Sequence, residues 1–167
     1  MPLGIKLVQA AQKEAALGRP FPLHAEAVEA LPKGGEVRAT AQIVDNDRLS
    51  KLASKVTVSV GGVKKPARSA GVQAKAEKLA EKATYLTEKL RFVETDLGGV
   101  AHVRSTPETM AGRGAPYYEA KVKENEITLR RYQAKAKGGR ESVPFCLTDD
   151  ILARVVDDAA EVLTPKG

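Results

Sequence analysis

The sequence predicts an α+β protein with one or more mostly antiparallel sheets, helices packed on one face, and a long helix at the C-terminus. Apolar and polar residues alternate at residues 37–43 and 56–60, which is typical of strands with one solvated face. Apolar residues recur at helical spacing over residues 73–90 and 151–163, which is typical of helices that bury one side.

The first thirty residues are predicted to form a helix and a strand. Helical spacing of apolar residues covers residues 5–17, and Gly18 and Pro20 end the helix. Alternation over residues 22–31 predicts a strand. A helix over the same residues stays an alternative, because Ala and Glu favour helices.

Residues 32–72 are predicted to be strands followed by a linker. A turn leads into the strand at residues 37–43, one helical turn is expected over residues 48–54, and the strand at 56–60 follows. Residues 61–72 hold three glycines, one proline and three basic residues without apolar periodicity. The sequence therefore predicts a β-rich subdomain with a short leading helix over residues 1–60, a linker over 61–72, and a second subdomain over 73–167.

The second subdomain is predicted to run α-β-β-β-β-β-α. The helix over residues 73–90 precedes strands near residues 90–94 and 100–105, and then a hairpin over residues 118–129. A last strand over residues 143–147 contains Pro144, which predicts an edge position because proline cannot donate to a neighbouring strand.

The C-terminal helix has clear boundaries in the sequence. Thr148 is a typical N-cap, and Asp149 and Asp150 follow in the first turn, where the helix dipole favours negative charge. Pro165 ends the helix.

Composition argues against a membrane protein and a disulfide-stabilised one. No stretch approaches the roughly 20 apolar residues of a membrane-spanning helix, and the N-terminus has no secretory pattern. The single cysteine, Cys146, can form no intrachain disulfide, which fits a reducing compartment. We therefore expect a cytoplasmic protein with no membrane partner.

Familiar catalytic constellations are absent from the sequence. His24 and His102 are far apart, and no metal-binding spacing occurs, so we expect no metal and no cofactor. Cys146 precedes a helix N-terminus, and His102 is the better candidate for its base, so a thiol enzyme stays open as a second alternative. The carboxylates at Asp150 and Asp158 flank Arg154 at helical spacing, which favours an ion-pair ladder over an acid/base pair.

A basic, tyrosine-containing hairpin is the clearest candidate surface. Residues 116–140 carry seven basic and three acidic residues, whereas residues 141–167 carry two basic and six acidic ones. Basic groups interleaved with tyrosines are what a single-stranded nucleic-acid platform needs. The same tyrosines could instead be cross-strand pairs that stabilise the sheet. The predicted binding residues are Arg104, Arg113, Tyr118, Lys121, Lys123, Arg130, Arg131, Tyr132 and Arg140. Arg104 lies just before the loop at residues 106–116, and Arg113 lies within it.

These patterns favour a non-enzymatic structural or interaction protein. One hypothesis is that it self-associates, because its basic hairpin and its acidic C-terminal helix are complementary surfaces. The first alternative is a nucleic-acid-binding protein that uses the hairpin at 116–140. The open partners are thus a second copy of the chain, a nucleic acid, or another acidic partner.

Overall fold

The structure is a computed structural model that describes residues 2–63, 71–86, 88–105 and 115–164. Three helices and nine strands occur in these ranges. In chain order they are α1 (Leu3–Ala16), β1 (Leu23–Ala30), β2 (Glu36–Asn46), β3 (Ser50–Gly61), α2 (Val72–Lys82), β4 (Leu90–Thr95), β5 (Ala101–Ser105), β6 (Tyr117–Val122), β7 (Glu126–Ala134), β8 (Arg140–Val143), β9 (Phe145–Thr148) and α3 (Asp149–Leu163).

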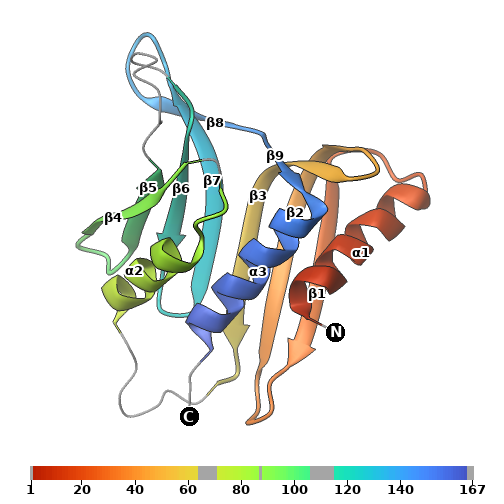
Figure 1. Ribbon diagram of the computed structural model, residues 1–167, viewed down its shortest axis with the longest axis horizontal. Helices are drawn as coiled ribbons and strands as arrows, with labels where there is room; N and C mark the ends of the chain where they lie inside the picture. Colours follow the sequence, from red (N-terminus) through yellow and green to blue (C-terminus); the bar gives the residue numbers. More distant parts are fainter. Residues whose placement is uncertain (1, 64–70, 87, 106–114, 165–167) are drawn as a thin grey trace.

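All nine strands belong to one antiparallel sheet. Its strand order is β1-β2-β3-β7-β6-β5-β4, with β8 added to β7 and β9 added to β3. The three helices lie together on one face of this sheet (Figure 1). We call this face the helix face and the opposite one the open face. The predicted α+β class, antiparallel sheet, helix placement and C-terminal helix are all confirmed.

The strand β3 joins the N-terminal strands to the rest of the sheet. Along one side it pairs with β2, starting where Gly61 lies opposite Glu36 and ending where Lys51 lies opposite Asn46. Along its other side, its first residues pair with β9 and its last residues pair with β7. The segments 1–60 and 73–167, predicted as two subdomains, therefore contribute to one sheet. Most of the predicted linker, residues 64–70, lies outside the described residues, and the separability of the two segments stays a prediction.

The helix face of the sheet carries the hydrophobic core. Valines and alanines of β2 and β3 meet leucines of α1 and α3 there, and Ile43, Val58, Leu7 and Leu152 are each at most 1% exposed. Because the chain has no tryptophan and few other aromatics, aliphatic side chains fill this layer. Phe145 adds an aromatic contact, edge-on to Tyr118 at 5.6 Å between ring centroids.

The predicted last strand is wrong in one respect, because it is two strands that join different neighbours. Arg140–Val143 pairs with β7, and Phe145–Thr148 pairs with β3. Pro144 lies between them, where the chain crosses from one neighbour to the other (Figure 1). Proline has no N–H to donate to a neighbouring strand, so it suits the position where the chain leaves β7 and joins β3.

Two further element predictions are corrected. The helical turn expected over residues 48–54 is the start of β3, because Ser50–Ala53 pairs with β9, a contact far away in the sequence. The helix expected over residues 73–90 ends at Lys82. Beyond it, the Tyr85 hydroxyl donates to Asp158 of α3 at 2.6 Å, which holds this segment out of the helix. Residues 22–31, for which strand and helix were both open, form the strand β1.

Among the described residues, no helix combines the length and the apolar composition needed to cross a bilayer.

The helices α1 and α3 cross in close contact at a glycine. A Cβ atom added to Gly4 would lie 2.1 Å from the backbone oxygen of Ala153 and 2.6 Å from its Cα. The Gly4 N–H donates to the Asp157 carboxylate at 2.8 Å, so a side chain of α3 binds the N-terminal end of α1. Small residues thus allow the two backbones to approach each other.

We expect Gly4→Ala to destabilise the protein by roughly 1–3 kcal/mol, because the added methyl group forces α1 away from α3. This is opposite in sign to the stabilisation of up to about 1 kcal/mol that Ala normally gives inside a helix. Urea denaturation monitored by circular dichroism measures the change. Gly71→Ala is the matched control, since its Cβ would meet nothing within 4 Å. Equal or higher stability of Gly4→Ala would contradict the close crossing.

Candidate functional site

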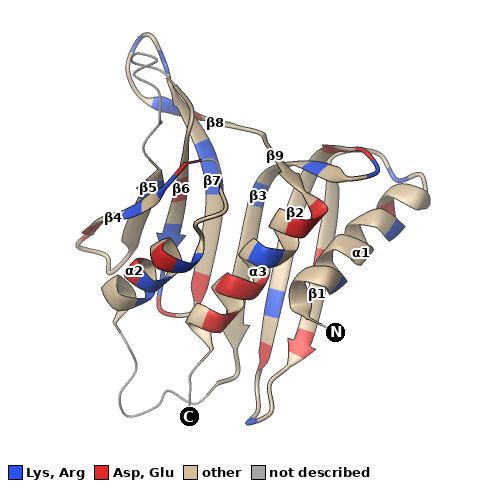
Figure 2. Ribbon diagram, in the orientation of Figure 1, with Lys and Arg blue, Asp and Glu red and all other residues tan. Residues whose placement is uncertain are grey.

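Basic side chains gather on the open face of β4, β5, β6, β7 and β8. Strand alternation and register place them at neighbouring positions. Arg91 lies directly across from Arg104 on the next strand, and Arg104 lies directly across from Glu119. Glu119 in turn lies directly across from Arg130. We call this set the basic face. Its basic residues are Arg91, Arg104, Lys121, Arg130 and Arg140. Figure 2 shows Lys and Arg along these strands, and acidic residues concentrated on α3.

A buried carboxylate, Glu119 on β6, organises the basic face. Its side chain is fully buried, and it accepts hydrogen bonds from two arginines on different strands. Arg104 Nε donates at 2.6 Å, while Arg140 donates through both terminal nitrogens at 2.6 and 3.0 Å. The bidentate geometry fixes the Arg140 guanidinium, because a planar fork matches a carboxylate.

The ionised form of Glu119 is strongly favoured. Burial alone would raise its pKa, but the hydrogen bonds and charges of Arg140 and Arg104 outweigh burial and lower the pKa to about 2. Glu119 in turn raises the pKa of Arg140, mainly through their hydrogen bond. The result is one buried negative charge held by two arginines, which leaves an excess of positive charge around it.

An imidazole completes the surroundings of Glu119. His102 on β5 lies with Nε2 3.0 Å from the Asp96 carboxylate and Nδ1 3.7 Å from the Glu119 carboxylate. The Nδ1 atom is buried and has no hydrogen-bond partner among the described residues. His102 is therefore hydrogen-bonded to Asp96 and lies beside Glu119 without a hydrogen bond to it.

Two tyrosines lie beside Arg140 on the same face. Tyr117 and Tyr132 are directly opposed across β6 and β7, with ring centroids 6.2 Å apart. The Arg140 guanidinium lies 3.9 Å from the centre of the Tyr132 ring and donates to the Tyr117 hydroxyl at 3.1 Å. The rings thus belong both to a cross-strand pair and to the basic face, and the use of these tyrosines as a nucleic-acid platform stays a prediction.

Three cations of the basic face have no internal carboxylate partner. Arg91, Lys121 and Arg130 form no ion pair with any part of the chain that the structure describes. Lys121 and Arg130 are only partly exposed, and Arg91 is exposed. Their charges are available to an external anion, whereas Arg104 and Arg140 are shared with Glu119.

The structure brings together five of the nine binding residues predicted from the sequence. Arg104, Lys121, Arg130, Tyr132 and Arg140 share the basic face, as their strand positions require.

The other four predicted residues lie elsewhere or are not described. Arg131 and Tyr118 point to the helix face, where Arg131 pairs with Glu88 at 2.9 Å and stacks on the Tyr118 ring at 4.4 Å. Lys123 lies beyond the end of β6 and pairs with Glu126 at 3.8 Å. Arg113 falls outside the described residues.

Sequence reasoning missed Glu119 and Arg91 as members of the site. Both lie at positions of strand alternation that point to the same face as the predicted residues, but the register that makes them neighbours could not be read from the sequence.

The acidic residues of α3 are largely engaged inside the molecule. Asp149 accepts from the buried Lys51 at 2.8 Å, and Glu161 accepts from Lys82 at 2.8 Å. Asp157 binds the start of α1, and Asp158 accepts from Tyr85. The Arg154 guanidinium stacks on the Tyr85 ring at 4.3 Å. This helix therefore uses its negative charges to dock other elements.

The candidate thiol site is not assembled as predicted. Cys146 is exposed on β9 and pairs opposite Leu52 of β3, while His102 lies on β5 beside Glu119. β6 and β7 separate β5 from β3 in the sheet. Through the strand register His102 lies level with Thr57 of β3, whereas Cys146 lies level with Leu52. The base proposed for Cys146 is therefore about five residues, or roughly 17 Å, away along the strands, in addition to lying on a different strand. Within the described ranges, no group of His, Cys, Asp and Glu residues could hold a metal ion.

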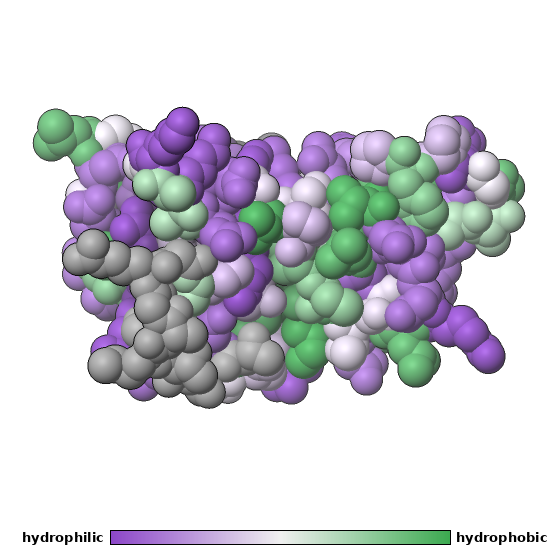
Figure 3. All heavy atoms as spheres, turned by 90° about the horizontal axis from the view of Figure 1, so that it is seen from above, coloured by the Kyte–Doolittle hydropathy of each residue, from purple (hydrophilic) through white to green (hydrophobic). Residues whose placement is uncertain are grey.

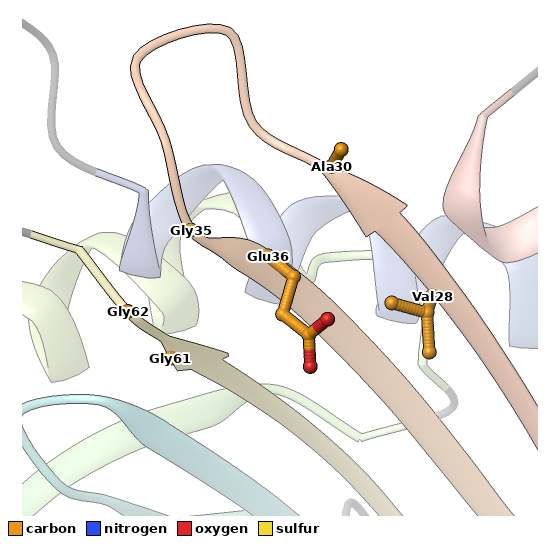
Figure 4. Close-up of a pocket in the computed structure, with 6 residues that line it drawn as sticks. All are labelled: Val28, Ala30, Gly35, Glu36, Gly61 and Gly62. Atoms are coloured by element: carbon orange, nitrogen blue, oxygen red, sulfur yellow. The ribbon is translucent and has the colours of Figure 1, made fainter.

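A shallow hollow lies at the far end of the sheet from Pro144. Its walls come from the ends of β1, β2 and β3, as Figure 4 shows. Glycines at 35, 61 and 62 leave it open, and its one charged residue, Glu36, pairs with Arg38 at 2.8 Å. Because its carboxylate already forms an ion pair, the hollow offers no acid/base pair for catalysis. The basic face is therefore the better candidate site.

Comparisons of the chain with protein-family models, with curated proteins and with solved structures find no match.

We expect Glu119→Gln to lower the free energy of unfolding at pH 7 by about 3 kcal/mol, because it leaves two arginines without their carboxylate. Glu119 has a lower pKa in the folded than in the unfolded chain. Its stabilisation is therefore complete above about pH 4.5 and is lost as the pH falls toward 2.

Urea denaturation at pH 7 and pH 3 tests this, and the difference between wild type and variant should shrink at pH 3. Glu126→Gln on β7 is the control. Its surface pair with Lys123 is expected to contribute less than about 1 kcal/mol. A difference that stays constant with pH would show that the Glu119 charge is not responsible.

Proposed function

We propose that this chain is a non-enzymatic interaction protein that binds an anionic partner through the basic face. One observation carries the proposal. Lys121 on β6, Arg130 on β7 and Arg91 on β4 have no carboxylate partner among the described residues, and they surround a pair of arginines that Glu119 holds in place.

The physical argument is preorganisation. Arg140 is fixed by Glu119 and by the Tyr132 ring, so little side-chain entropy is lost when an anion approaches it. Lys121 and Arg130 add long-range attraction, which speeds association with a negatively charged partner. An acidic surface of a protein and a phosphate backbone both satisfy this chemistry.

Self-association through the acidic helix receives less support from the geometry. Four of the five acidic groups that α3 carries beyond its N-cap, namely Asp149, Asp157, Asp158 and Glu161, have partners within the same molecule. The remaining one, Asp150, is exposed. A single carboxylate offers little charge to complement the basic face of a second copy.

Single-stranded nucleic acid is the second candidate ligand, favoured by Tyr117 and Tyr132 on the same face as the cations. Aromatic rings beside arginines on an open sheet allow bases to stack while phosphates are bound. The two rings are tilted by 38° with 6.2 Å between centroids, which is also the geometry of a cross-strand pair that stabilises the sheet.

The test is a binding titration with a single-stranded oligonucleotide and with polyglutamate at several salt concentrations. For the oligonucleotide we expect Lys121→Gln/Arg130→Gln to weaken binding about tenfold at low salt. The same change should reduce the slope of log affinity against log salt by roughly 1.4, the value for two phosphate contacts. Neither substitution removes an ion pair within the described residues, so the fold should be kept.

Lys33→Gln/Arg48→Gln is the matched control, because it removes the same charge from turns at the other half of the sheet. Oligonucleotide binding without polyglutamate binding identifies nucleic acid as the ligand class, and the converse identifies an acidic protein. Equal losses in both double variants, or no binding of either polyanion, would overturn the role of the basic face.

A further inference from the structure

Several cations of the basic face belong to a row of residues that crosses the sheet. Directly opposed residues of adjacent strands lie side by side on the same face, so the register gives the row one member on each strand. The row passes from Arg91 on β4 through Arg104 on β5 and Glu119 on β6 to Arg130 on β7. From there it continues into the N-terminal half of the sheet.

Lys55 on β3 is the next member of the row. Val56 and Leu129 form the last pair between β3 and β7 at this end. Lys55 and Arg130 are the residues immediately beyond that pair on the two antiparallel strands, so they lie beside each other. The row then reaches the remaining strands of the sheet order, and its members on β2 and β1 are Gln42 and His24.

The row carries one acidic side chain, and arginines bind both of its oxygens. Glu119 is fully buried and accepts from Arg104 and Arg140. The neighbouring row on the open face differs, because it ends in Glu26 on β1 and in Glu94 on β4. A chain of negative charges that follows the row of Glu119 therefore meets cations without passing an exposed carboxylate in that row.

Both ends of the cationic part of the row are available to a ligand. Lys55 is partly exposed and Arg91 is exposed, and neither forms an ion pair with the described part of the chain. The three helices lie on the other face of the sheet, so no described helix covers the row (Figure 1). Adjacent strands lie about 4.8 Å apart, so the path from β4 across β5, β6 and β7 to β3 spans roughly 19 Å.

We propose that a single-stranded nucleic acid binds along this row, across the strands from β4 to β3, with its phosphates on the cations. This inference rests on the proposed anion-binding function, and it names the partner and the path that the partner takes. A strand stacked as in a duplex carries one phosphate per about 3.4 Å, so roughly 19 Å accommodates about five or six nucleotides. That length lies within the roughly 4–16 nucleotides that a single-strand binding groove covers.

The tyrosine pair favours a nucleic acid over an acidic peptide. Tyr117 and Tyr132 are partly exposed, and they lie one open-face position beyond Glu119 and Arg130 on the same two strands. Bases project to the side of the phosphate chain, so they reach the rings beside the row while the phosphates stay on it. The carboxylates of an acidic peptide supply charge but no ring that stacks.

A path along the strands meets fewer cations than the path across them. A ligand that followed β6 and β7 lengthwise beyond Lys121 would meet Thr128, which lies opposite Lys121, and then Glu126 on β7. Such a ligand would contact neither Lys55 nor Arg91, because these residues lie on other strands. The two paths therefore differ in the residues that they use.

A length series of oligothymidylates tests the path. The affinity of wild type should rise steeply up to about six nucleotides, the length of the cationic part of the row, and only slightly beyond it. Lys55→Gln/Arg91→Gln should weaken binding of a hexamer about tenfold at low salt. It should also reduce the slope of log affinity against log salt by roughly 1.4, the value for two phosphate contacts. A trimer spans only the middle of the row, so an NMR titration should show equal affinity for both proteins.

The matched control is again Lys33→Gln/Arg48→Gln, which removes the same charge away from the row and should leave hexamer binding unchanged. If Lys121→Gln/Arg130→Gln weakens hexamer binding but Lys55→Gln/Arg91→Gln does not, the basic face binds anions and the path across the strands is wrong. If neither an oligonucleotide nor another polyanion binds, the proposed function and the path are both overturned.

Tyr132→Leu tests the class of ligand. It should weaken hexamer binding about tenfold at every salt concentration without changing the salt slope, because stacking releases no counterions. An inorganic polyphosphate of similar charge should bind the variant and wild type equally, and circular dichroism verifies that the fold is kept. An equal loss for polyphosphate and hexamer would show that the ring acts only by positioning Arg140, and it would overturn nucleic acid as the partner. Binding of polyglutamate without binding of the hexamer would overturn it as well.

Discussion

The structure depends on the two partners that β3 has along one of its sides. Its first residues, Ser50–Ala53, pair with β9, and its last, Val56–Ser59, pair with β7. The N-terminal hairpins and the C-terminal strands would otherwise be two separate small sheets. Pro144 allows this arrangement, because the chain changes partner there from β7 to β3 without needing a hydrogen-bond donor. The core is therefore continuous across both halves, and so is the open face on which the basic residues gather.

The charged side chains have different kinds of partner on the two faces of the sheet. On the helix face, carboxylates meet groups that need them: Asp149 compensates the buried Lys51, and Asp157 binds the N-terminal end of α1. On the open face, cations outnumber Glu119, the one buried carboxylate among the described residues. Figure 3, looking down on the end where β8 leads into β9, shows hydrophilic residues over the β4–β8 half and more hydrophobic ones over the other half. The open face around Glu119 thus carries more cations than carboxylates.

Local patterns were sufficient for most elements and insufficient for the site. Alternation at residues 37–43 and 56–60 follows from burial of one strand face, so these strands could be predicted from neighbours in the sequence. The grouping of Glu119 with Arg104 and Arg140 depends on strand register across 15 and 21 residues, which no local pattern encodes. The same holds for the end of α2, which a contact of Tyr85 with α3 determines across 73 residues. What the sequence could not supply was in each case a long-range partner.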